Sequence, residues 1–207
     1  MKLKKHDIKR YFLKLKEKFE GEKEKLCQLD SAVGDGDHGT SMAKGMREIS
    51  DRLKDEDPDD IASIFAIASQ TFTSQVGGSI GPLFGAIFKE FSKTTDGLGQ
   101  IDLKAAEEMF QRATKQVKVI GGVERGEKTL LDALAPAADA LAVARKNDLC
   151  LEEGLEKARS AAKQGVKDSK DMVGTKGRAR YMKDESRGHK DPGAVSVFLI
   201  IESLSDL

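Results

Sequence analysis

Apolar residues recur three and four positions apart in seven stretches of the chain, which is the spacing of one buried helix face. Polar residues fill the positions between them, so each predicted helix is amphipathic. The stripes cover residues 8–26, 42–53, 61–72, 83–91, 109–120, 130–141 and 151–166. Glycine pairs at 77–78 and 121–122 end the third and fifth of these helices.

Three residues are expected to shape particular helices. Asp59 can cap the third helix and Pro82 can open the fourth. Pro136 lies within the sixth and should bend or interrupt its hydrogen-bond ladder. The last apolar segment, 192–204, is ambiguous because VSVFLII is β-rich and apolar on all sides. We interpret it as a buried eighth helix, since the sequence offers it no partner strand.

Eight helices joined by short breaks predict one all-α domain over residues 1–207, an antiparallel barrel or bundle. Antiparallel packing puts alternate connections at the same end. The connections after the first, third, fifth and seventh helices are glycine-rich, whereas 55–60, 94–100 and 146–150 are ordinary polar turns. Glycines that only end helices would explain each loop separately, but their concentration at one end indicates a site at that rim.

Bulk composition excludes several classes of function. Lys plus Arg and Asp plus Glu number 35 each in 207 residues, so no net field favours nucleic acid or an anionic membrane. The longest apolar run, 195–201, is too short to span a bilayer. Cys27 and Cys150 have no metal-binding spacing, and the N-terminus does not resemble a signal peptide. A reducing cytoplasm is the expected setting.

The segment 29–46, LDSAVGDGDHGTSMAKGM, carries the most chemistry. Asp30, Asp35 and Asp37 repel one another, so a turn that holds them must spread them into water or enclose a hard cation. Mg²⁺ fits best, because it takes few carboxylates together with phosphate oxygens and water. The literal GxGxxG match follows a helical pattern rather than a strand, and the EF-hand and P-loop patterns fail. A solvated turn that caps the next helix remains the alternative.

The same rim offers further groups for a polyphosphate. Hydroxyls come from Thr40, Ser41, Ser79 and Thr129, and a cation from Arg178. His38 adjoins Asp37 and could hold a metal ligand or donate to a phosphoryl oxygen, whereas His189 is expected to be an ordinary surface residue. Asp191 before Pro192 and Gly193 is a good helix N-cap.

Four separated strings, in order, resemble the nucleotide-binding L subunit of dihydroxyacetone kinase. They are LDSAVGDGDHGTSMAKGM, VGGSIGPLFG, GEKTLLDAL and KGRARYMKDESRGHKDPGA, spread over residues 29–194. The resemblance implies an antiparallel eight-helix barrel that holds ADP or ATP and two Mg²⁺ ions at one end.

The resemblance also implies roles for individual residues. Asp30, Asp35 and Asp37 would bind magnesium, and Arg178 and His38 would act in catalysis. Nucleotide contacts would come from the following residues: His38, Gly39, Thr40, Ser41, Ser79, Ile80, Gly121, Leu130, Arg178, Asp191, Pro192 and Gly193. The chain departs from the family at Ile80, where serine is usual, and at Lys183 and Asp184, which replace a Gly-Glu pair.

By the same resemblance, the bound nucleotide phosphorylates dihydroxyacetone held on a separate K subunit. A phosphohistidine protein of the phosphotransferase system recharges ADP in one branch of the family, and free ATP is the donor in the other. A chain without a fused sugar-binding domain favours the first branch. Another small keto sugar as substrate, a regulatory interaction protein loaded with nucleotide, and a homodimer remain open.

Overall fold

The computed structural model describes residues 2–207 and contains eight α-helices in that range. They are α1 (Lys5–Ser31), α2 (His38–Glu56), α3 (Ile61–Gln75), α4 (Ile80–Thr95), α5 (Leu103–Gly121), α6 (Leu131–Lys146), α7 (Leu151–Asp168) and α8 (Pro192–Ser205). Two 3-10 turns, η1 (Ala179–Tyr181) and η2 (Lys183–Ser186), lie between α7 and α8. Between residues 2 and 207, β pairing is limited to one bridge, Leu3 to Ile101. The all-α prediction, including the helical last segment, is confirmed.

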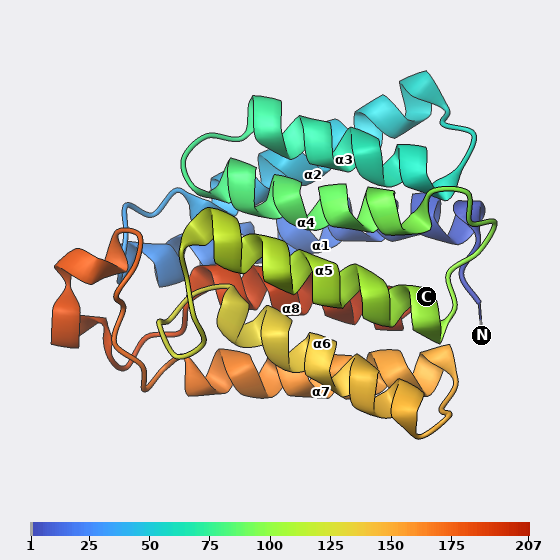
Figure 1. Ribbon diagram of the computed structural model, residues 1–207. Helices are drawn as coiled ribbons and strands as arrows, with labels where there is room; N and C mark the ends of the chain where they lie inside the picture. The colour runs from blue at the N-terminus through green and yellow to red at the C-terminus, as the bar shows by residue number, and fades with distance from the viewer. Residues whose placement is uncertain (1) are drawn as a thin grey trace.

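The helices form a closed ring. Each packs against the next along the chain, and α8 packs against α1, which closes the ring into a barrel. In Figure 1 the connections after α1, α3, α5 and α7 lie together at the left end, whereas the two termini lie at the right. The predicted convergence of the four glycine-rich connections is therefore confirmed.

Phenylalanine rings fill the half of the barrel made by α1, α3, α4 and α5. Phe12 on α1 meets Phe65 on α3 edge-on, with ring centroids 5.9 Å apart. Phe91 on α4 lies 5.0 Å from Phe110 on α5. Such tilted and edge-on pairs add to the hydrophobic gain of burial, so this half supplies a rigid base for the loops above it.

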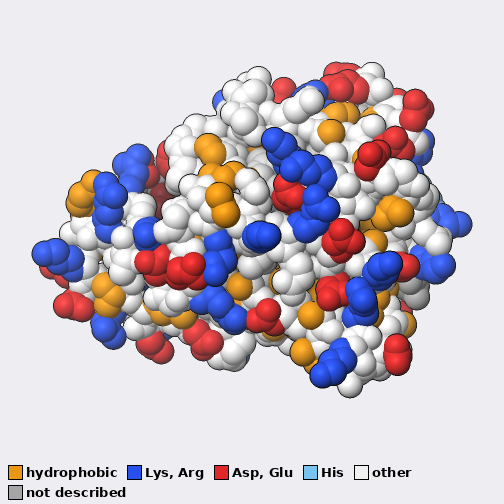
Figure 2. Space-filling view, viewed as in Figure 1, with side chains coloured by type: hydrophobic (Ala, Val, Ile, Leu, Met, Phe, Trp, Pro, Cys, Tyr) orange, Lys and Arg blue, Asp and Glu red, His pale blue; other side chains and the backbone are white. Residues whose placement is uncertain are grey.

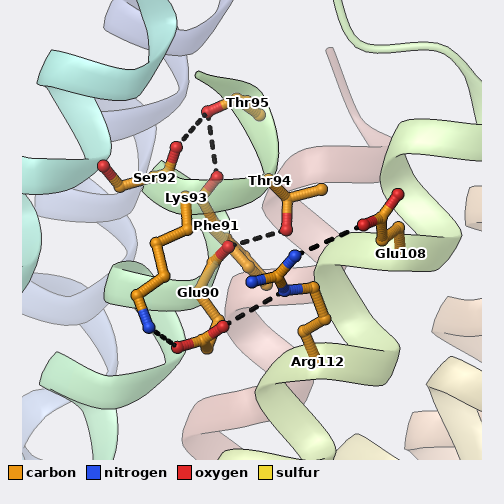
Figure 3. Close-up of polar contacts among 8 residues, drawn as sticks. All are labelled: Glu90, Phe91, Ser92, Lys93, Thr94, Thr95, Glu108 and Arg112. Carbon is orange, nitrogen blue, oxygen red and sulfur yellow. Dashed lines mark hydrogen bonds and ion pairs between the residues drawn. The ribbon is translucent and has the colours of Figure 1, made fainter.

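A buried carboxylate joins α4 to α5. Glu90 is only 5% exposed, and it accepts hydrogen bonds from Lys93 Nζ at 2.6 Å and Arg112 Nε at 3.2 Å (Figure 3). Burial raises the pKa of Glu90, but the bonds from these two cations outweigh burial and hold the pKa below its usual value. The group therefore stays ionised at neutral pH.

Three helix starts and ends differ from the predicted ones. Asp60, not Asp59, caps α3, because its side chain accepts from Ser63 N at 2.7 Å. Helix α4 begins at Ile80, so Pro82 lies at its third position, where a missing N–H still costs no intrahelical bond. Helix α1 continues to Ser31 and carries Asp30 on its last turn.

Pro136 does not interrupt α6, which continues from Leu131 to Lys146. Proline lacks the N–H that would bond to the carbonyl four residues earlier, that of Asp132. At this carbonyl α7 comes very close, since a Cβ built on Gly165 would lie 1.9 Å from Asp132 O. Packing against α7 therefore holds α6 together at the position where proline weakens it.

The surface carries both signs of charge. Figure 2 shows Lys and Arg side chains interspersed with Asp and Glu over the viewed face, without a continuous field of either sign. Over the described part of the chain, every helix is too short or too polar to cross a membrane.

Candidate nucleotide and metal site

A cavity of about 460 Å³ opens at the rim where the four glycine-rich connections meet. This volume is in the range usual for small-molecule sites. Thirteen of the residues that the sequence analysis assigns to the site line it: Asp30, Asp35, Asp37, His38, Ser79, Ile80, Gly121, Thr129, Leu130, Arg178, Asp191, Pro192 and Gly193. Segments that are up to 163 positions apart along the sequence thus form one pocket.

Three aspartates form the acidic wall of the cavity. Asp30 lies on the last turn of α1, Asp35 lies in the following turn, and Asp37 immediately precedes α2. One carboxylate oxygen from each lies within 4.8 Å of the others. Gly34 makes room for this arrangement, because a Cβ there would lie 2.4 Å from Asp30 Oδ1. Gly36 adopts φ of 80°, which turns the chain back toward α2.

The charges of this wall suit a divalent cation. Burial raises the pKa of Asp37, and the negative charges of Asp35 and Asp30 raise it further. Arg178 opposes that shift, and its guanidinium lies 2.7 Å from Asp35 Oδ2. Carboxylate oxygens are the ligands that Mg²⁺ prefers, so the three aspartates fit this ion in chemistry and in spacing.

His38 begins α2 and is buried at 6% exposure. Its Nε2 lies 2.8 Å from Ser196 Oγ on α8. Burial lowers the pKa of His38 to about 4, so the ring is neutral at pH 7. A neutral imidazole that already pairs with Ser196 has one ring nitrogen left, and it carries no charge toward a phosphate.

The next three residues of the predicted phosphate loop do not line the cavity. Gly39 is buried against α1, where a Cβ would lie 2.0 Å from Lys23 O. Thr40 Oγ1 lies 3.6 Å from Cys27 Sγ, and Ser41 N bonds to Asp37 O within the helix. Close packing of α2 on α1 therefore accounts for the glycine at position 39.

The cavity also has an apolar wall, and most of it escaped the sequence analysis. Pro82 and Leu83 come from α4, Ile120 from the end of α5, and Val123 from the connection that follows. Each residue belongs to a stripe or loop that sequence alone assigns to helix packing. The signal that could have identified these residues is their position at the rim end of each helix. A flat aromatic base would fit such an apolar wall.

Residues 169–191, here called the lid segment, connect α7 to α8, and several of them line the cavity. Figure 1 shows this segment standing out from the barrel at the rim. Lys176 Nζ donates to Gly122 O at 2.6 Å, and Thr175 N donates to Glu127 O at 3.3 Å. These bonds hold the lid segment, which carries Arg178, against the connection between α5 and α6.

Asp191 caps α8 as predicted, because its Oδ2 accepts from Ala194 N at 2.6 Å. Burial raises the pKa of Asp191 to about 7, against the lowering effect of the Ala194 N–H and the Lys128 ammonium. His189 lies in the lid segment, and its carbonyl oxygen accepts from Lys128. Lys128 also lines the cavity and is a residue that the sequence analysis did not select.

The fold and the site together define a class: an all-α barrel whose rim holds a cluster of three carboxylates beside a partly apolar pocket. The DAK2 domain model matches residues 32–206, and the chain belongs to this family. The resemblance drawn from the four sequence strings is confirmed.

Two relatives extend over nearly the whole chain. It is 35% identical to the ADP-binding subunit DhaL of PEP-dependent dihydroxyacetone kinase 1 of Listeria innocua, covering 91% of this chain and 89% of the relative. It is 34% identical to the ADP-binding subunit DhaL of the Escherichia coli PEP-dependent dihydroxyacetone kinase, with coverage of 90% and 89%.

A solved structure shares the fold. The crystal structure of the Citrobacter freundii dihydroxyacetone kinase in complex with AMP-PNP and Mg²⁺ aligns with a TM-score of 0.73 at 25% identity. The alignment covers 96% of this chain and 33% of that one, so the present chain spans about a third of the longer kinase.

Proposed function

We propose that this chain, residues 1–207, is a single L-type domain that serves as the ADP-binding subunit of a PEP-dependent dihydroxyacetone kinase. The observation that carries the proposal is the acidic trio, whose oxygens lie within 4.8 Å of one another at a cavity that also has an apolar wall. Relatives named as ADP-binding subunits match the chain nearly end to end, which supports the separate-subunit form of the enzyme.

In this proposal the two walls of the cavity bind different parts of the nucleotide. The apolar wall binds the base, and Asp30, Asp35 and Asp37 hold two Mg²⁺ ions at the phosphates. Bound Mg²⁺ neutralises phosphate charge and so supports phosphoryl transfer. Arg178 already lies beside Asp35, so its guanidinium can donate to the phosphoryl group that moves.

His38 acts in its neutral form. Because burial lowers its pKa to about 4, it can position or donate one hydrogen bond but does not add positive charge. Its bond with Ser196 connects the start of α2 to α8. The imidazole therefore orders the acidic turn, and Arg178 supplies the cationic stabilisation.

Two protein partners complete the reaction. A K-type subunit holds dihydroxyacetone, and a phosphohistidine protein of the phosphotransferase system recharges the bound ADP. The rim is the surface through which both must reach the phosphates, because the cavity opens there. The names of the relatives, which include PEP dependence, support recharging of bound ADP over exchange with free ATP.

The test measures nucleotide binding and transfer in matched variants. Wild-type protein should retain ADP in the presence of Mg²⁺ and release it when EDTA removes the metal. D35N should lose at least about a hundredfold in affinity, since even outer-shell partners of a metal cost about 10–100-fold when mutated. D59N removes an exposed aspartate in the connection between α2 and α3 and should bind ADP normally.

Transfer is then measured with a K-type subunit, dihydroxyacetone, PEP and the phosphotransferase proteins. Wild-type chain and D59N should support dihydroxyacetone phosphate formation, and D35N should not. Wild-type affinity for ADP in D35N would remove the basis of the metal assignment. Correct binding without any transfer would leave a regulatory role for the bound nucleotide.

A further inference from the structure

Lys128 occupies an unusual position between α5 and α6. Its backbone φ is 60°, in the left-handed region that residues other than glycine seldom adopt, and its side chain is 2% exposed. Asp132 holds the turn in this conformation. Its Oδ1 accepts from Gly126 N at 2.5 Å, and its Oδ2 accepts from Thr129 N at 2.8 Å.

The Lys128 ammonium reaches both ends of the lid segment. Nζ donates to the carbonyl oxygen of Ser169, the C-cap of α7, and to that of His189, two residues before the α8 N-cap. One side chain thus joins the residue where the lid segment leaves the barrel to the residues where it returns.

Hydrogen bonds between uncharged groups also join the two ends of the lid segment, residues 169–170 and 188–191, here called the neck. Asp191 N donates to Ser169 Oγ at 3.1 Å, and Gly188 N donates to Lys170 O at 2.8 Å. A charged donor binds a carbonyl more strongly than a neutral one. Removal of the ammonium would also leave the carbonyl oxygens of one buried and one part-buried hydrogen bond without this donor.

Three carboxylates lie around the Lys128 ammonium. Burial lowers the pKa of Lys128 below its usual value, and Asp191, Asp171 and Asp132 offset part of that shift. These three carboxylates come from the return of the lid segment, from its start and from α6, respectively. The lysine therefore lies at the centre of a small group of opposite charges.

The neck is directly connected to the cavity wall. A Cβ built on Gly193 would lie 3.2 Å from Leu130 Cβ, so the turn that holds Lys128 packs against the start of α8. Lys128, Leu130 and Gly193 all line the cavity, as does Arg178 in the lid segment. A movement of the neck would therefore displace residues on two sides of the pocket.

We propose that Lys128 is a positioning residue whose ammonium joins the two ends of the lid segment and so fixes Arg178 and the 191–193 turn at the cavity. The effect of Lys128 on nucleotide binding rests on the proposed function. The effect of Lys128 on how firmly the lid segment is held does not rest on that function.

The test compares two variants that each remove one buried charge. K128M keeps the length and apolar stem of the side chain but removes the donor. E90Q, at the junction of α4 and α5, is the matched control, because Glu90 is buried but does not line the cavity. Amide hydrogen exchange is measured for wild type, K128M and E90Q without ligand, and ADP affinity is measured with Mg²⁺.

In K128M, amides of residues 170–191 should exchange at least about tenfold faster than in wild type, with the barrel helices little changed. Its Kd for ADP with Mg²⁺ should rise by about tenfold, which corresponds to about 1.4 kcal/mol. E90Q should lower the melting temperature and leave both quantities near the wild-type values. If K128M does not fold, K128Q is used in the same comparison.

Wild-type exchange of residues 170–191 in K128M would overturn the proposal, as would faster exchange spread evenly over the barrel. Failure of the wild-type chain to bind ADP with Mg²⁺ would instead overturn the proposed function. The exchange measurement on ligand-free protein would still decide the role of Lys128.

Discussion

Replacement of Gly39 by alanine tests whether this glycine serves the packing of α2 on α1. The added Cβ would lie 2.0 Å from Lys23 O and 2.9 Å from both Cys27 N and Cys27 Sγ. A carbon next to a carbonyl oxygen needs about 3.3 Å, so the two helices would have to separate by more than about 1 Å. Two of the three contacts are with backbone atoms, which a side-chain rotation cannot relieve.

The expected cost follows from this geometry. Overpacking a well-packed contact costs about 1–3 kcal/mol, and the backbone clash puts G39A at the upper end. For a chain of this size, about 3 kcal/mol lowers the melting temperature by about 6–12 °C. Asp30 lies on the last turn of α1 and Asp37 precedes α2, so separation of the helices should also weaken Mg²⁺-dependent ADP binding.

Gly21 provides the matched control on the same helix pair. It is exposed on α1, and a Cβ built there meets nothing within 4 Å. G21A should therefore stabilise the protein by about 0.5–1 kcal/mol through helix propensity alone. Urea and thermal unfolding without ligand measure both variants, and calorimetry measures ADP binding with Mg²⁺. Stability of G39A equal to that of G21A would refute the packing argument.

Three other predictions concern stability. D60A should lower the free energy of unfolding by about 1 kcal/mol because it removes the α3 cap. D59A should change urea unfolding little, and a larger loss in D59A than in D60A would show that Asp59 is the cap. Because the pKa of His38 falls from 6.5 to about 4 on folding, stability should be complete above pH 6.5 and decline by about 3 kcal/mol as pH falls to 4. Unfolding of H38Q over the same pH range should lack this slope, and an unchanged slope would assign it to other groups. E90Q should lower the free energy of unfolding by about 1–3 kcal/mol because Arg112 and Lys93 lose their ionised partner. An unchanged midpoint in chemical unfolding would show that this buried contact contributes no net stability.

Much of the fold could be predicted because helical periodicity is a local property of the sequence. Stripes such as Ile8, Phe12 and Leu15 identify helices without knowledge of any neighbour. Errors occurred where a neighbour decides the outcome. Pro136 by itself predicts a bend or an interruption of α6, but the helix continues through it where Gly165 approaches closely. Likewise, the choice between Asp59 and Asp60 depended on which residue adopts an extended backbone before Ile61.

The acidic wall could be predicted, because it lies in one continuous segment with distinctive chemistry. The apolar wall could not, since Leu83, Ile120 and Val123 look like ordinary packing residues until the barrel places their ends together. Gly39 has a packing role that the sequence did not show, because its neighbour is the α1 backbone.

The sequence by itself determined the eight helices, the acidic turn and the family, because these depend on residue type and spacing within short segments. Only the tertiary structure decided which side chains share the cavity, the neutral state of buried His38, and the place of Lys128 between two ends of the lid segment. The physical reason is that burial and contact depend on residues far apart in sequence, and packing alone brings them together.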